Sequence, residues 1–247
     1  MLLLFSLALI SKLDATPETS DIKHRALQFG ATTNDFIRFA LDTTPLQDAL
    51  SICTWIKRVS TSSSLPVVFD LFSQEEHEIL IGSDGRYNRV AGDHVLDNHN
   101  RKFATQPPGR WFSYCLTWSS TSRAIQLYLD GEQVAAARTS TARMLRSSGV
   151  VRFNRLENSE SSAFVFGGQL FQFNIFSGVL SPQSIKKMAE GGLCFDFEEE
   201  LLDRIIMSWE NVVLKPKNGT VIETIGCYLT DGKKMATSEP SRNKEDL

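Results

Sequence analysis

Residues 111–137 read WFSYCLTWSSTSRAIQLYLDGEQVAAA, and this stretch decides the fold class. Apolar and polar residues alternate in three short runs, 111–118, 125–129 and 133–137, as they do in half-buried β-strands. Asp130-Gly131 lies between the last two runs and supplies the positive φ angles that a tight β-turn requires. The stretch therefore predicts antiparallel strands, two of them joined as a hairpin.

Similar runs, separated by turn-forming residues, occur on both sides of this hairpin and are rich in β-branched and aromatic residues. They are residues 36–41, 50–59, 67–72, 78–82, 150–156 and 169–176. Strands this short and this numerous predict an all-β antiparallel sandwich.

One short helix is predicted after the last of these strands. Ser181 can cap its first turn, Pro182 suits its first position, and Gly191-Gly192 would end it. We therefore expect a single helix packed on a β-sandwich.

The composition fits one ordinary globular domain, with 247 residues of which 42% are hydrophobic and 22% charged. A net charge of −3 provides no basic field that could neutralise phosphates, so we expect no nucleic-acid partner. No Gly-x-Ser-x-Gly motif, P-loop or dinucleotide fingerprint is present, which argues against an enzyme of those classes.

Residues 1–18 begin with the apolar run MLLLFSLALI, which has the length of a signal-peptide core and is too short to span a bilayer. A buried N-terminal strand or helix is the alternative. No later run is long and apolar enough to anchor the chain, so we expect a secreted protein without a membrane span. Its sandwich domain would occupy residues 19–229, and the polar residues 230–247 would form a disordered tail.

Four cysteines are enough for two disulfides in an oxidising compartment: Cys53, Cys115, Cys194 and Cys227. They contain no Cys-x-x-Cys pair, so neither a zinc ribbon nor a thioredoxin-type site is predicted. The sequence alone allows three connectivities. Asn218 opens an Asn-Gly-Thr sequon and is a candidate glycosylation site on a surface turn.

A set of motifs runs through the chain in a fixed order. Residues 113–120 (SYCLTWSS) match a signature in which His precedes Cys-x-Ser/Thr-Trp-x-Ser/Thr, with Ser113 in place of the His. Further matches are residues 49–55 (ALSICTW), 78–81 (EILI), 129–131 (LDG), 168–176 (GQLFQFNIF), 179–182 (VLSP) and 208–209 (SW). In their order and spacing these motifs resemble the pentraxin family, over residues 27–227.

The resemblance implies a jelly-roll of two antiparallel sheets, of the lectin and laminin-G type, with one short helix. It also implies a Cys53–Cys115 bridge, which leaves Cys194 and Cys227 to pair with each other; free buried thiols are the alternative. Pentraxins recognise extracellular carbohydrate or phosphorylated groups and commonly form cyclic pentamers. We therefore expect a secreted, homo-oligomeric binding protein and not an enzyme.

A calcium (Ca2+) site is the cofactor that the resemblance implies. Such a site needs about six to eight oxygen ligands. The family's Asp-Asn pair in the first loop corresponds to Glu76 and His77, and a hard cation disfavours the nitrogen of an imidazole. The second loop offers Glu157, Asn158 and Glu160. The alternative is a solvated acidic loop in a calcium-independent adhesion or structural module.

Two further clusters of polar residues could be functional sites or ordinary polar surface. Asp93, His94, Asp97 and His99 crowd one predicted loop, which could hold a transition metal or could simply be polar. Residues 195–200 (FDFEEE) alternate carboxylates as some sandwich-fold glycosidases do, but Cys194 stands where the leading carboxylate would be. An exposed acidic segment is the expected reading of 195–200.

Overall fold

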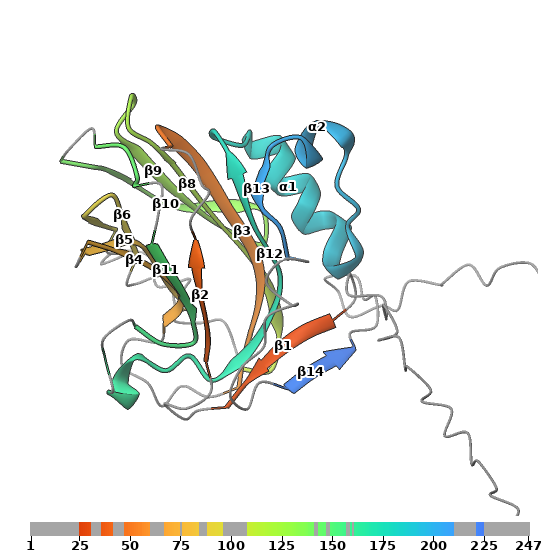
Figure 1. The fold of residues 1–247 in the computed structure, drawn as a ribbon. Helices are drawn as coiled ribbons and strands as arrows, with labels where there is room; N and C mark the ends of the chain where they lie inside the picture. The colour runs from red at the N-terminus through yellow and green to blue at the C-terminus, as the bar shows by residue number, and fades with distance from the viewer. Residues whose placement is uncertain are drawn as a thin grey trace, which may run out of the picture.

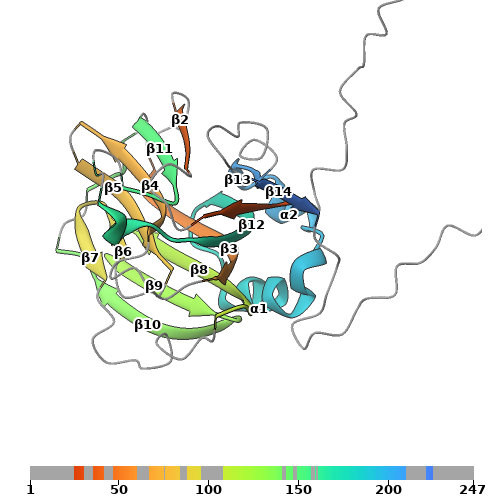
Figure 2. The ribbon, with the colours of Figure 1, turned by 90° about the horizontal axis from the view of Figure 1, so that it is seen from below.

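The computed structural model describes residues 25–30, 36–41, 47–59, 67–74, 76–83, 88–95, 108–140, 143–146, 149–156, 159, 161–209 and 221–224. Within them, two antiparallel β-sheets pack face to face, and helices lie outside one sheet (Figure 1). Figure 2 shows the same layers from below, with β4, β5 and β11 facing β3, β8 and β12. The predicted all-β sandwich is confirmed.

The larger sheet has eight strands among the described residues, in the order β10-β9-β8-β3-β12-β1-β14, with β13 paired to β12. Its strands are β1 (Arg25–Phe29), β3 (Ala49–Arg58), β8 (Trp111–Ser119), β9 (Ala124–Leu129), β10 (Glu132–Arg138), β12 (Gly168–Ser177), β13 (Ile205–Met207) and β14 (Val221–Thr224). The predicted hairpin is β9–β10, and Asp130 and Gly131 have φ angles of 48° and 80°.

The smaller sheet has six strands among the described residues, in the order β2-β11-β4-β5-β6-β7. Its strands are β2 (Ile37–Leu41), β4 (Val67–Ser73), β5 (Glu76–Gly82), β6 (Asn88–Val90), β7 (Asp93–Val95) and β11 (Gly149–Phe153). Asp93 and His94 belong to β7, so the prediction of a loop there was wrong. Ala91 and Gly92 have φ angles of 52° and 87°, and they form a tight turn that pairs β6 with β7.

The core lies between the two sheets and is built on aromatic rings. Phe69, Phe153 and Phe173 are fully buried, and their ring centroids lie 4.6–5.3 Å apart. A buried hydrogen bond also links the sheets, since the Tyr114 hydroxyl contacts Asn88 Oδ1 at 2.7 Å. This pairing satisfies two polar groups that would otherwise be costly to bury.

A second apolar cluster covers the outer face of the larger sheet. There Cys53 of β3 and Cys115 of β8 are Cα partners and form a disulfide, as the resemblance implied. Cys194 is also disulfide-bonded, while Cys227 lies outside the described residues. The cluster includes Ile185 and Met188 of the helix that covers this face.

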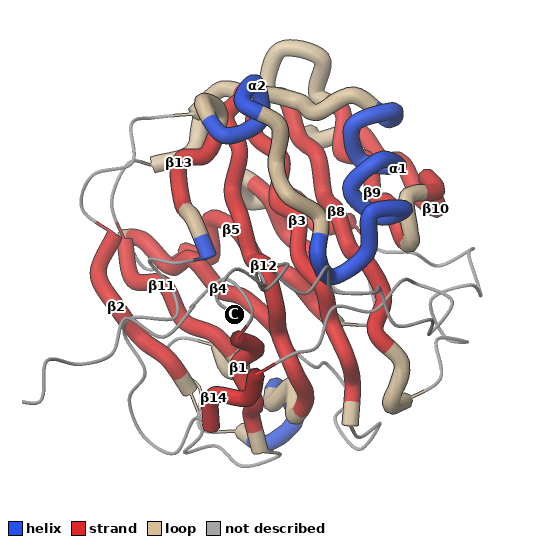
Figure 3. The backbone as a smooth tube through the Cα atoms, turned by 90° about the vertical axis from the view of Figure 1, so that its right-hand side faces the viewer, coloured by secondary structure: helices blue, strands red, loops and turns tan. Residues whose placement is uncertain are grey.

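That helix is α1 (Pro182–Gly191), and Ser181 caps it by accepting a hydrogen bond from the Ser184 amide at 3.0 Å. Figure 3 shows α1 over the outer face of the larger sheet. A one-turn helix, α2 (Glu199–Leu202), and two short 3-10 turns, Ser162–Phe164 and Gly192–Cys194, complete the described helices. The described residues include no helix long and apolar enough to cross a membrane.

Candidate functional site

The two residues that correspond to the first calcium loop lie in a strand. Ser73 of β4 pairs directly with Glu76, so Glu76 and His77 belong to strand β5 and not to the loop before it. A tight turn at Gln74, whose φ is 47°, makes this possible. The two side chains are therefore held by strand pairing and not by a flexible loop.

His77 is bound to a carboxylate of the same sheet. Its Nδ1 lies 2.7 Å from Oδ1 of Asp70, a residue of β4 whose side chain is fully buried. The ring of Phe72 contacts the imidazole edge-on, with centroids 5.0 Å apart. This contact orients His77 toward Asp70, and the imidazole nitrogen serves a structural hydrogen bond.

Glu76 and Glu78 are paired with two arginines from the segment between β10 and β11. Arg143 Nη1 and Arg146 Nη1 lie 3.0 and 3.2 Å from Glu78 Oε1. Arg143 Nη2 and Arg146 Nη1 lie 3.4 and 3.5 Å from Glu76 Oε2. We call these four side chains the arginine–glutamate cluster.

Burial decides which pairs in this cluster matter. The Glu78 side chain is 0% exposed, whereas those of Arg143 and Arg146 are 31% and 29% exposed. A buried carboxylate is stable only when it is paired, and the two guanidinium groups supply the partners of Oε1, while Oε2 is buried without a hydrogen-bond partner among the described residues. Two positive and two negative charges thus balance within the cluster.

The arginine–glutamate cluster argues against calcium binding at Glu76 and His77. The guanidinium N–H groups use carboxylate oxygens that a calcium ion would need, and His77 offers only nitrogen to a hard cation. No group of three or more His, Cys, Asp or Glu side chains in the described part of the chain could hold a metal ion. Glu157, Asn158 and Glu160 lie outside the described residues, as do Asp97 and His99, so the second loop remains a prediction.

The outer face of the smaller sheet carries a row of residues in register, four of them charged and one apolar. Arg38, Arg152, Asp70, Leu80 and Arg89 follow one another as Cα partners across β2, β11, β4, β5 and β6. Arg38 is exposed, and Leu80 is buried with Leu156. Arg152 is buried and donates to the Leu156 carbonyl, so Arg38 is the most exposed of the three arginines. We call these aligned residues the arginine row.

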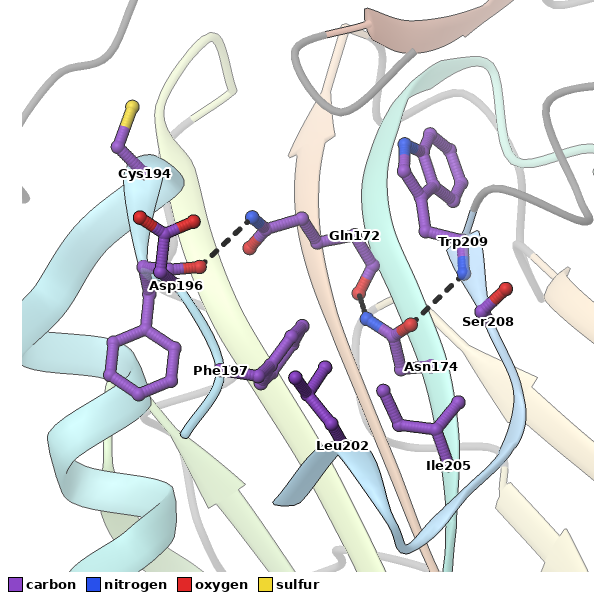
Figure 4. Close-up of a pocket in the computed structure, with 10 residues that line it drawn as sticks. Gln172, Asn174, Cys194, Asp196, Phe197, Leu202, Ile205, Ser208 and Trp209 are labelled. Atoms are coloured by element: carbon purple, nitrogen blue, oxygen red, sulfur yellow. Dashed lines mark hydrogen bonds between the residues drawn. The ribbon is translucent and has the colours of Figure 1, made fainter. Parts of the chain in front are cut away.

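A separate pocket lies on the outer face of the larger sheet (Figure 4). It has a volume of about 230 Å³, and its walls come from β12 and from the segment that follows α1. The described residues that line it are Gln172, Asn174, Cys194, Phe195, Asp196, Phe197, Leu202, Ile205, Ser208 and Trp209. Residues 195–197, predicted to be an exposed acidic segment, thus form one wall of a pocket.

Sequence analysis missed Arg143, Arg146, Gln172 and Trp209. The arginines lie in a segment without periodicity, and Arg143 is 65 residues from the glutamate that it contacts. Gln172 stands inside an apparently regular strand. Trp209 was noted only as part of a family motif, and its place in a pocket depends on tertiary packing.

Comparison with known proteins identifies the family to which this fold is similar. Residues 31–186 match the family model Laminin_G_3, described as the concanavalin A-like lectin/glucanases superfamily. The chain is 24% identical over 169 residues to Pentraxin-related protein PTX3 of Bos taurus, which covers 61% of this chain and 41% of that protein. It is 26% identical over 165 residues to Neuronal pentraxin-2 of Cavia porcellus, covering 61% of this chain and 36% of that protein.

A longer relative aligns over more of the chain. The Sushi, von Willebrand factor type A, EGF and pentraxin domain-containing protein 1 of Rattus norvegicus is 23% identical over 205 residues, which cover 79% of this chain and 5% of that protein. The chain thus spans less than half the length of these three relatives.

Among solved structures, the heptameric SAP-like pentraxin from Limulus polyphemus matches with a TM-score of 0.64 at 15% identity, covering 83% of this chain and 97% of that one. The extracellular region of zebrafish Gpr126 matches with a TM-score of 0.58 at 13% identity, covering 83% of this chain and 28% of that one. These likenesses show the jelly-roll fold.

Proposed function

This chain belongs to the Laminin_G_3 family of the concanavalin A-like lectin/glucanases superfamily, and from this membership we propose that it is an extracellular, pentraxin-like ligand-binding protein. Its ligands are carbohydrates or phosphorylated groups, and binding does not depend on calcium. Family membership carries the binding function, and the observation that supports its independence from calcium is the pairing of Glu76 and Glu78 with Arg143 and Arg146.

The arginine row suggests which ligands the smaller sheet prefers. Guanidinium groups bind phosphate and carboxylate oxygens through directed N–H bonds and stay charged at all ordinary pH values. Arg38 is exposed at the edge strand of this sheet. A phosphorylated glycan supplies both the anionic groups and the hydroxyls that such a surface can bind.

The remaining parts of the proposal concern processing, glycosylation and assembly. Residues 1–18 act as a signal peptide before a sandwich domain at 19–229, and residues 230–247 form a polar tail. Asn218 carries a glycan. The mature protein assembles with copies of itself, an expectation that the heptameric pentraxin from Limulus polyphemus supports.

Capture on coated surfaces tests the proposal. Purified full-length protein is passed over phosphorylated mannan and over unphosphorylated mannan, first in millimolar calcium and then in EDTA. We expect stronger capture on the phosphorylated surface, with no release by EDTA. Release by EDTA would instead support the calcium-dependent form of pentraxin binding, and no capture on either surface would contradict the proposal.

A matched pair of variants locates the surface. Arg38→Gln removes an exposed arginine of the arginine row, and Arg138→Gln removes an exposed arginine of β10 in the other sheet. We expect capture to fall several-fold for Arg38→Gln and to stay unchanged for Arg138→Gln. Equal losses in both variants would mean that only the net charge matters.

A further inference from the structure

The pocket on the outer face of the larger sheet contains a residue in a rarely adopted backbone conformation. Gln172 has a φ of 49°, in the middle of β12, where the pairing with β3 shifts register between Phe171 and Asn174. Residues other than glycine rarely adopt a left-handed conformation. Irregularities of this kind in a strand often change the direction of a side chain at a functional site. Here the bulge places the Gln172 amide in the pocket (Figure 4).

Hydrogen bonds hold the polar side chains of the pocket in place and leave acceptor oxygens available for a ligand. Gln172 Nε2 donates to the carbonyl of Phe195 at 3.4 Å, and Asn174 Oδ1 accepts from the Trp209 amide at 2.9 Å. Gln172 Oε1 makes no hydrogen bond with the described residues. Asp196 is exposed at the pocket, and its carboxylate makes no ion pair or hydrogen bond within the described part of the chain.

Much of the remaining lining is apolar. It includes Phe197, Leu202, Ile205 and Trp209, and Phe195 meets Phe197 edge-to-face with ring centroids 5.6 Å apart. No lysine or arginine is among the described lining residues. The site therefore suits a neutral ligand with one apolar face and one edge of hydroxyl groups.

From this arrangement we propose that the pocket binds a single neutral sugar residue, such as the terminal hexose of a glycan. A pyranose ring presents C–H groups on its faces and hydroxyls around its edge. The C–H face packs against the aromatic wall, while adjacent hydroxyls donate to the Asp196 carboxylate and to Gln172 Oε1. A volume of about 230 Å³ lies below the range of about 300–1,000 Å³ that holds drug-sized ligands, so it fits one ring better than an oligosaccharide.

This site is independent of the function proposed for the smaller sheet. It lies on the other sheet, uses no arginine, and would exclude the anionic ligands that the arginine row attracts. Capture on phosphorylated mannan exceeds capture on unphosphorylated mannan only through the phosphate groups. Variants in the pocket leave that difference unchanged, so failure of one proposal is distinguishable from failure of the other.

The test is a titration of the full-length protein with selectively ¹⁵N-labelled tryptophan. Four indole N–H signals are expected, since the chain has four tryptophans, and Trp209→Phe assigns the one in the pocket. The probes are the methyl glycosides of glucose, galactose, mannose and N-acetylglucosamine, with N-acetylneuraminic acid as an anionic control. We expect at least one neutral probe to shift the Trp209 signal saturably, with a dissociation constant of about 1 mM. The anionic control should have no effect.

Two variants and a control make the result specific. Asp196→Asn removes a charged acceptor and should weaken binding about ten-fold. Gln172→Gly relieves the left-handed backbone, so it should abolish binding while the melting midpoint stays equal or rises. Glu200→Gln, an exposed change on α2 outside the pocket, should change neither.

The proposal is overturned by either of two outcomes. One is that no neutral probe shifts the Trp209 signal; the other is that the affinity of Asp196→Asn equals that of the unaltered protein. If Gln172→Gly fails to fold, Asp196→Asn still decides, because Asp196 is exposed and makes no described contact that folding requires.

Discussion

Replacing Arg143 and Arg146 together by methionine should destabilise the sandwich by about 3–5 kcal/mol. The reason is that Glu78, whose side chain is 0% exposed, would lose both of its guanidinium partners, which lie 3.0 and 3.2 Å from Oε1. Removing the partners of a buried charge leaves that charge uncompensated, and losses of about 3–5 kcal/mol are typical. Methionine keeps much of the arginine stem, so lost packing contributes little.

Two single changes in the same cluster calibrate this magnitude. Glu78→Gln should cost about 2 kcal/mol, because the arginines left behind are 31% and 29% exposed and water can solvate them. Glu76→Gln should cost less than about 1 kcal/mol, because its carboxylate is 54% exposed and exposed pairs contribute little. The expected order of destabilisation is therefore the double arginine variant, then Glu78→Gln, then Glu76→Gln.

Urea unfolding monitored by tryptophan fluorescence measures these differences, and thermal melts provide a second readout. At about 2–4 °C per kcal/mol for a domain of this size, the double variant should melt about 6–20 °C lower. A loss below about 1 kcal/mol for the double variant would refute the argument. Equal losses of stability for Glu76→Gln and Glu78→Gln would also refute it, because burial could not then determine how much each ion pair contributes.

Three further predictions follow from other parts of the fold. Replacing Cys53 and Cys115 by alanine removes a bridge with a sequence separation of 62, worth about 4 kcal/mol in the chain-entropy model, and a urea titration under non-reducing conditions would measure this loss. Burial raises the pKa of Asp130 above its ordinary value of 3.8, against the opposing effects of the Ser113 amide and Arg110. The folded state thus holds this proton more tightly, so the Asp130 contribution to stability is present below pH 3.8 and is lost as pH rises through the folded pKa. Over that pH range Asp130→Asn should become more stable relative to the unaltered protein. Thermal melts between acid and neutral pH would measure this difference. Ser181→Ala removes the N-cap of α1 and should cost about 1 kcal/mol in the same urea assay, whereas Ser181→Asp should restore it.

The strands that sequence patterns predicted are at least five residues long, rich in β-branched and aromatic residues, and bounded by turn-forming residues. The β9–β10 hairpin is an example, because Asp130-Gly131 favours one turn geometry whatever surrounds it. Strands β6, β7 and β13 have three residues each and were not predicted, since so short a segment has no period to detect. Their existence depends on neighbouring strands that hold them in place.

The sites were harder to predict than the fold, for two physical reasons. The pairing of Arg143 and Arg146 with Glu78 joins segments about 65 residues apart, and an arginine in an irregular segment does not indicate its partner. The left-handed conformation of Gln172 occurs at a residue that is not glycine, inside an apolar run that is typical of an ordinary strand. Tertiary packing imposes that conformation, so local sequence gives no sign of it.

A thermal melt in calcium and in chelator tests the central claim most directly. Full-length protein is melted in millimolar calcium chloride and in EDTA, at equal ionic strength. Because the arginine–glutamate cluster already supplies the positive charge, we predict the same melting midpoint in both conditions. A functional calcium site at 100 times its dissociation constant would add about 2.7 kcal/mol, or about 5–11 °C. A rise of that size in calcium would contradict the account.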